Sequence, residues 1–134
     1  LKGTVDRLEI DSDGKVYIVD LKSGASDATK ETVQSNMQLA GYQLAIARDG
    51  FVNQHPGTTP GGAELVFLGG TTNSASVKTQ FAINVDETEE KIVELADLMS
   101  GATFTATINS RCRTCGVKSM CPLQPQGRSV IDEN

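Results

Sequence analysis

Two aspartates and a lysine near the start of the chain have the types and spacing of a metal-dependent hydrolytic site. Asp6 lies in one strand-like segment, and Asp20 and Lys22 lie two residues apart in the next. Side chains two residues apart on a strand share a face, so Lys22 is expected on the same side as Asp20. Carboxylate oxygens bind Mg²⁺, and an adjacent ammonium can orient a water and neutralise charge on a phosphate. The alternative interpretation is three exposed charges at the rim of an ordinary hairpin.

The turn between the two strands decides whether the carboxylates meet. A two-residue turn centred on Asp13 and Gly14 would place them on opposite faces. A three-residue loop over 12–14, with Gly14 in the left-handed conformation, sets Asp6 directly opposite Asp20. That register also gives one apolar face, made by Leu8, Ile10, Val16 and Ile18. We therefore favour it, and because opposed like charges destabilise a sheet, it predicts a divalent cation between the carboxylates.

Further strands and helices are expected around this hairpin. Strand-like segments cover 3–10, 15–21, 63–69 and 76–84, and helical segments cover 29–48 and 87–100. This order predicts an α/β fold with a mixed sheet flanked by helices.

The helices and the long loop carry local signals of their own. The apolar stripe of the first helix is Val33, Met37, Ala40 and Leu44. The second helix has Asp86 and Glu89 placed as a capping-box-like pair. A loop is predicted over 50–62, and its His55 is interpreted as a solvated residue rather than a catalytic one.

Composition limits the function classes. The 134 residues suit one domain, and 12 basic against 17 acidic residues give a net charge of −5, which is unfavourable for gripping a polyanion unaided. The stretch 101–128 has no acidic residue, and its basic residues are Arg111, Arg113, Lys118 and Arg128. It is interpreted either as a solvated loop or as a contact with nucleic-acid phosphates. We find no apolar run of roughly 18–20 residues and no secretory signal, and expect a soluble, cytoplasmic protein.

Three closely spaced cysteines indicate a second metal centre. Cys112, Cys115 and Cys121 form a C-x2-C-x5-C pattern. In a cytoplasmic protein such spacing favours metal over disulfides. Zinc and a four-iron cluster both take four ligands, one more than this chain offers.

Three motifs occur together in an order that resembles a known family. They are Gly3-Thr4-Val5-Asp6-Arg7, Val19-Asp20-Leu21-Lys22-Ser23-Gly24 and Gln38-Leu39-Ala40-Gly41-Tyr42. Over most of the chain they resemble the PD-(D/E)XK nucleases of the RecB and AddB type. The resemblance implies a restriction-endonuclease-like fold with Mg²⁺ or Mn²⁺ bound by Asp6, Asp20 and the Leu21 carbonyl. It makes Lys22 the catalytic lysine and has Gln38 and Tyr42 hold DNA or position that lysine.

The resemblance also implies a setting. Residues 1–128 would be the nuclease core, including a cysteine segment over 104–128, and 129–134 a tail. The cysteines would hold a 4Fe-4S cluster whose fourth cysteine lies upstream. The function implied is DNA cleavage in a nucleoid-associated bacterial helicase-nuclease of break repair and recombination. Its partners would be DNA, a helicase/ATPase region of the same chain and a second helicase-nuclease subunit, with no membrane.

The family's earlier helix and first strand are not in this sequence, so we expect a domain truncated at its N-terminus. The sheet would then lack an edge strand, and the activity of this segment alone is in question. Two other functions remain open: a stand-alone RecB-like exonuclease, and a catalytically silent domain that binds DNA or a protein. Intact Asp6, Asp20 and Lys22 argue against the silent domain, because such a domain has no need of opposed carboxylates.

Overall fold

The computed structural model describes residues 3–25, 28–50, 58–70, 74–103, 105–125 and 127. The chain forms two compact units, Leu1–Glu94 and Leu95–Asn134. His55, most of the predicted 50–62 loop and Arg128 lie outside the described residues.

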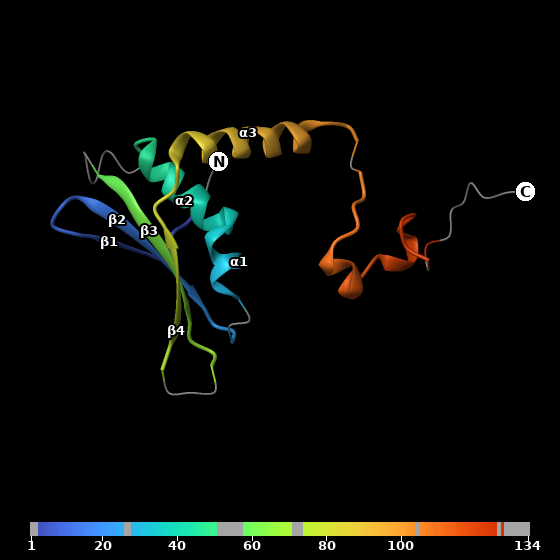
Figure 1. The fold of residues 1–134 in the computed structure, drawn as a ribbon, viewed down its shortest axis with the longest axis horizontal. Coiled ribbons are helices and arrows are strands. Elements are labelled where there is room, and N and C mark those ends of the chain that lie inside the picture. Colours follow the sequence, from blue (N-terminus) through green and yellow to red (C-terminus); the bar gives the residue numbers. More distant parts are fainter. Residues whose placement is uncertain are drawn as a thin grey trace, which may run out of the picture. The chain divides into compact units, whose positions relative to one another are not determined.

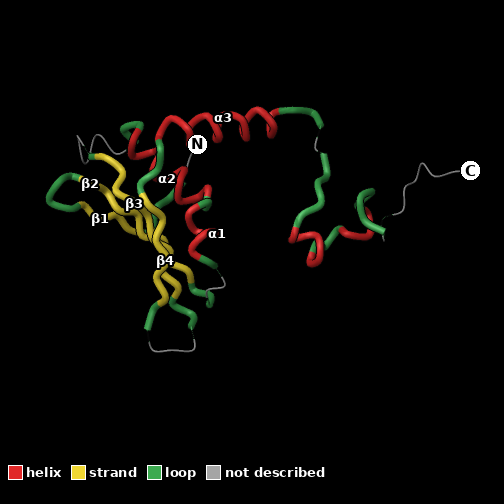
Figure 2. The backbone as a smooth tube through the Cα atoms, viewed as in Figure 1, coloured by secondary structure: helices red, strands yellow, loops and turns green. Residues whose placement is uncertain are grey.

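The first unit is built on a four-stranded sheet in the order β1-β2-β3-β4 (Figure 1). Its strands are β1 (Arg7–Ile10), β2 (Lys15–Lys22), β3 (Thr59–Phe67) and β4 (Ser76–Phe81). β2 and β3 are parallel, whereas both outer pairs are antiparallel. The crossover between the parallel strands carries α1 (Lys30–Gln34) and α2 (Met37–Ala47), which lie beside the sheet in Figure 2. The predicted mixed sheet flanked by helices is confirmed.

The β1–β2 hairpin has the predicted three-residue loop. The Asp11 N–H donates to the Lys15 carbonyl at 3.0 Å, and Gly14 has the left-handed φ of 78°. Leu8 then faces Ile18, so the register that opposes Asp6 and Asp20 is confirmed. The prediction that the first strand spans 3–10 is wrong, because the ladder begins at Arg7.

The prediction of one helix over 29–48 is also wrong. Ser35 and Asn36 separate α1 from α2, and Asn36 has extended backbone angles (φ −72°, ψ 108°). Its side chain accepts the Leu39 N–H at 3.1 Å and so caps α2 as a new helix. The break lets Val33 of α1 and Leu39 of α2, 1% and 0% exposed, both face the core.

β3 begins in a segment predicted to be loop. The strand starts at Thr59 and ends at Phe67, so the boundaries 50–62 and 63–69 are both wrong. Val16 pairs with Pro60 but Tyr17 pairs with Gly62, which leaves Gly61 as an extra bulge residue. A β carbon at Gly61 would lie 2.8 Å from Cζ of Tyr17, so only glycine lets the strand pass the ring here.

The helix α3 (Val85–Ser100) follows β4, which ends at Phe81 rather than at 84. Asn84 caps it by accepting the Glu87 N–H at 3.3 Å, so the predicted Asp86 and Glu89 capping pair is wrong. Glu89 instead forms a short ion pair with Arg48 at the end of α2.

The core of the first unit lies between one face of the sheet and the helices α1 and α2. It comprises Val16, Ile18, Val33, Leu39, Ile46, Ala63 and Leu65. Of the predicted stripe, Val33, Ala40 and Leu44 are buried and Met37 is half-buried.

The second unit contains two 3₁₀ turns, η1 (Ser110–Thr114) and η2 (Lys118–Met120). Neither turn has a buried residue. No helix in the described part of the chain is both long and apolar enough to cross a membrane.

Candidate active site

The core-facing side of β2 changes from apolar to charged along the strand. Val16 and Ile18 are in the core, whereas Asp20 and Lys22 follow on the same face. Asp20 is only 5% exposed. A buried carboxylate is costly unless a charge or a hydrogen bond compensates it, so its neighbours define the site.

Both oxygens of Asp20 have a close neighbour. Nε2 of Gln38 lies 3.3 Å from Oδ1, and Nζ of Lys22 lies 2.5 Å from Oδ2. The ammonium is at ion-pair distance but is not aligned as a hydrogen-bond donor, and Oδ2 has no other partner in the described part of the chain. Oδ2 is therefore a buried, charge-compensated oxygen with lone pairs still available.

Asp6 is held beside Asp20 by the backbone. Its Oδ2 accepts the Leu21 N–H at 2.9 Å. Along β2 every second residue points its N–H toward β1, and Leu21 is the next such residue after Val19. The Asp6 carboxylate accepts this N–H in place of a backbone carbonyl of β1. This explains why β1 pairs only from Arg7. The register of the ladder, continued by one pair beyond Arg7 and Val19, sets Asp6 opposite Asp20 at a position without ladder hydrogen bonds, where Cα atoms are about 4.5 Å apart.

The first turns of α2 complete the cluster. Gln38 and Tyr42 lie four residues apart on one helix face, and Nε2 of Gln38 donates to Oη of Tyr42 at 2.9 Å. The Tyr42 ring packs against the core. A β carbon at Gly3 would lie 3.4 Å from Cε1 of this ring, so the segment before Asp6 runs along it. The structure thus brings Asp6, Asp20, Lys22, Gln38 and Tyr42 together.

The two carboxylates suit a small hard cation. No group of three His, Cys, Asp or Glu side chains forms a metal site among the described residues. Mg²⁺ is usually bound by one or two carboxylates, with water and phosphate oxygens filling the remaining positions. Asp6, Asp20 and the available Oδ2 lone pairs fit that requirement.

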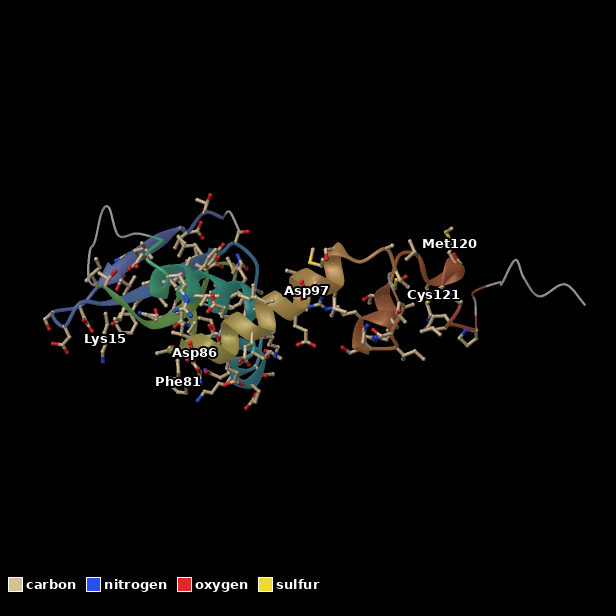
Figure 3. The ribbon with its side chains drawn as sticks, turned by 90° about the horizontal axis from the view of Figure 1, so that it is seen from above. Lys15, Phe81, Asp86, Asp97, Met120 and Cys121 are labelled. Atoms are coloured by element: carbon tan, nitrogen blue, oxygen red, sulfur yellow. The ribbon has the colours of Figure 1, made fainter. Side chains whose placement is uncertain are left out.

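The three cysteines belong to the second unit, whereas the carboxylate cluster belongs to the first. Figure 3 labels Cys121. All three are free thiols, Cys115 exposed and the others half-buried. Cys115 and Cys121 end η1 and η2, and the Asn109 N–H lies 3.3 Å from the sulfur of Cys112. The structure does not gather the three sulfurs into a ligand set.

A buried glutamine network behind the site was not predicted. Gln43 of α2 and Gln80 of β4 are 0% and 2% exposed, and they are hydrogen-bonded to each other. Gln34 of α1 bonds the outer edge of β4, to Thr79 and Phe81. One signal was available in the sequence: Gln43 falls on the apolar face of its helix, where a polar residue needs a buried partner.

A mixed α/β sheet that carries an aspartate opposite an Asp-x-Lys strand belongs to the restriction-endonuclease-like class of folds. The profile of the PD-(D/E)XK nuclease superfamily matches residues 1–122, and the chain belongs to that superfamily. The matched range includes both the carboxylate cluster and the cysteines. No curated protein matches the chain.

Proposed function

We propose that this domain hydrolyses DNA phosphodiesters with Mg²⁺ or Mn²⁺. The observation that carries the proposal is Oδ2 of Asp20, a buried carboxylate oxygen whose one close neighbour among the described residues is the Lys22 ammonium. Membership of a nuclease superfamily supports hydrolysis, and Asp6 opposite Asp20 supplies the second carboxylate that a hard cation requires.

Each residue of the cluster has a proposed role that follows from its position. Asp6, Asp20 and the Leu21 carbonyl would hold the cation, which when bound supplies positive charge to the phosphate and acidifies a water. Lys22 orients the attacking water and offsets the charge that develops on the phosphate oxygens. Gln38 holds the Asp20 carboxylate in place and links it to Tyr42, and the two side chains would hold DNA or position Lys22.

The wider setting is proposed on the order of the three motifs. We assign the domain to the RecB/AddB-like group and to a cytoplasmic, nucleoid-associated helicase-nuclease of DNA break repair and recombination. Its partners are DNA, the helicase region and a second subunit. A stand-alone RecB-like exonuclease is the alternative, and it differs in lacking ATPase motifs in the intact reading frame. The Asp20–Lys22 ion pair argues against a catalytically silent domain.

Replacement of one carboxylate tests the assignment. Linear DNA is incubated with the intact protein in Mg²⁺ or Mn²⁺, and the Asp20→Ala variant is compared with Asp13→Ala, which removes an exposed aspartate from the same hairpin. Asp20→Ala should lower cleavage by about 100-fold or more, whereas Asp13→Ala should not. Undiminished cleavage by Asp20→Ala contradicts the assignment. Absence of cleavage by the intact protein in both metals removes the hydrolytic function and leaves a domain that only binds DNA or a protein.

We further propose that Cys112, Cys115 and Cys121 are three ligands of a 4Fe-4S cluster, completed by a cysteine upstream in the intact protein. The family match reaches residue 122, so the matched range includes all three cysteines. Anaerobically prepared intact protein should be brown and contain about four irons per chain. Its thermal stability should fall in Cys115→Ala, because the cluster closes a long loop. Stoichiometric zinc without iron in this preparation would contradict the cluster and indicate a zinc site instead.

A further inference from the structure

We propose that Gln80 is a positioning residue for the active site. Its buried side-chain amide sets the place of the first turn of α2, and through that turn it holds Gln38 against Asp20. The inference rests on the proposed function for its catalytic consequence. Its structural part stands on hydrogen bonds alone.

One end of Gln80 holds the junction between the two helices. Its Nε2 lies 3.0 Å from each of three backbone carbonyls, those of Val33, Gln34 and Asn36. Val33 and Gln34 are the last residues of α1, and Asn36 is the cap of α2. Carbonyl oxygens only accept hydrogen bonds. If the Gln80 amide were flipped, its own oxygen would face these three oxygens, so the amide has only one possible orientation.

The other end of Gln80 holds α2 further along. Its Oε1 accepts Nε2 of Gln43 at 3.0 Å, and the same Nε2 donates to the Phe81 carbonyl at 3.1 Å. Oε1 of Gln43 accepts the Ile83 N–H at 3.3 Å. In this series of hydrogen bonds, the partners of Gln80 and Gln43 therefore fix which end of each side-chain amide donates and which accepts. α2 is tied to the end of β4 both at its cap and about two turns later, which fixes its rotation and its translation.

The site depends on that placement. Gln38 is two residues beyond Asn36, in the turn that Gln80 fixes, and its bond to Asp20 is 3.3 Å long. A 3.3 Å contact is already slightly beyond the usual range for an N–H···O bond. A small rotation of α2 would therefore remove it, and Asp20 would lose its second partner.

The replacement Gln80→Met tests the inference, because methionine fills a similar volume without an amide. Its matched control is Gln34→Met. Gln34 bonds the same strand, through Nε2 to the Thr79 carbonyl at 2.7 Å and Oε1 to the Phe81 N–H at 3.2 Å. Its side chain makes no hydrogen bond to α2 among those of the described residues. Both variants loosen the contact between α1 and β4, but only Gln80→Met frees α2.

The first readout does not require cleavage. In NMR spectra of the metal-free chain, the side-chain amide resonances of Gln38 should shift in Gln80→Met and stay in place in Gln34→Met. Unmoved Gln38 resonances in folded Gln80→Met overturn the inference, whether or not the chain cleaves DNA. If Gln80→Met does not fold, Gln80→Asn keeps an amide that is too short to reach all three carbonyls, and it should shift the same resonances.

The second readout uses cleavage and a double variant. Gln80→Met should lower the cleavage rate roughly tenfold in the unmodified background, since small displacements of positioned groups are costly. In the Gln38→Ala background it should lower the rate no further, because the interaction that it acts through is gone. If Gln80→Met instead lowers the cleavage rate by the same factor in both backgrounds, and the only other change is a lower stability, Gln80 is merely structural. Failure of the intact, unmodified protein to cleave defeats the proposed function, and the NMR result then still decides whether Gln80 positions Gln38.

Discussion

Nζ of Lys22 and Oδ2 of Asp20 lie 2.5 Å apart, so the Lys22 ammonium and an incoming cation would compete for one buried oxygen. Removal of the ammonium should therefore strengthen cation binding while it weakens cleavage.

We expect Lys22→Met to bind Mn²⁺ roughly tenfold more tightly, which corresponds to ~1.4 kcal/mol. Isothermal titration calorimetry measures the affinity, and Lys30→Met, which removes an exposed lysine from α1, is the control. Weaker Mn²⁺ binding by Lys22→Met would show that the lysine assists the cation rather than competing with it.

Asp6 has a structural and an electrostatic role that two substitutions separate. Asp6→Asn keeps an oxygen to accept the Leu21 N–H, which lies 2.9 Å from Oδ2 in the unmodified chain. It should weaken Mn²⁺ binding at least about tenfold and change stability by less than about 0.5 kcal/mol. Asp6→Ala should lose, in addition, about 1 kcal/mol of unfolding free energy with the hydrogen bond. Equal Mn²⁺ affinities in Asp6→Asn and the unmodified chain, measured by calorimetry, would remove Asp6 from the ligand set.

Gly62 is required by its backbone conformation. Its φ is 147°, and a β carbon there would lie 2.9 Å from the Gln80 carbonyl oxygen. Gly62→Ala should therefore lower the unfolding free energy by about 2 kcal/mol, measured by urea denaturation. Gly24→Ala is the control, because a β carbon at Gly24 meets nothing within 4 Å. Similar losses in the two variants would show that the strain at Gly62 is relieved by movement of β3.

The ion pair between α2 and α3 makes stability depend on pH. The hydrogen bond from Arg48 holds the pKa of Glu89 below its ordinary value of 4.5. A carboxylate whose pKa falls on folding stabilises the native state above its unfolded pKa and loses that effect as the pH drops through its folded pKa. The stability difference between the unmodified chain and Glu89→Gln should thus be full at pH 7 and shrink steadily below about pH 4.5. A difference that is constant from pH 7 to pH 3, in urea denaturation, would contradict this.

The hairpin could be predicted from sequence because its determinants are local. Gly14 supplies the turn, and the alternation from Leu8 to Ile18 allows one register with an apolar face. Once that register is set, Asp6 must oppose Asp20. Lys22 follows from the two-residue repeat of the strand. Gln38 and Tyr42 are identified by the family resemblance, and the four-residue repeat of the helix adds only that they share a face.

The helix break and the start of β3 could not be predicted, because their causes lie far away in the chain. The helical periodicity continues from Val33 to Leu44 through Asn36, and besides the local Asn36 cap the break is stabilised by the amide of Gln80, 44 residues beyond Asn36. The Thr-Pro-Gly-Gly segment has loop composition, but the Tyr17 ring beside it requires a residue without a side chain. In both cases the partner is visible only in the folded chain.

The amide of Gln34 has a consequence for the protein in a crowded cell. An outer strand offers unpaired N–H and C=O groups on which a strand of another molecule can build. On β4 the Thr79 carbonyl and the Phe81 N–H are already occupied by one side chain, at 2.7 and 3.2 Å. Another polypeptide must displace Gln34 before it can pair with β4 there. This side chain therefore hinders aggregation through strand addition at this edge of the sheet.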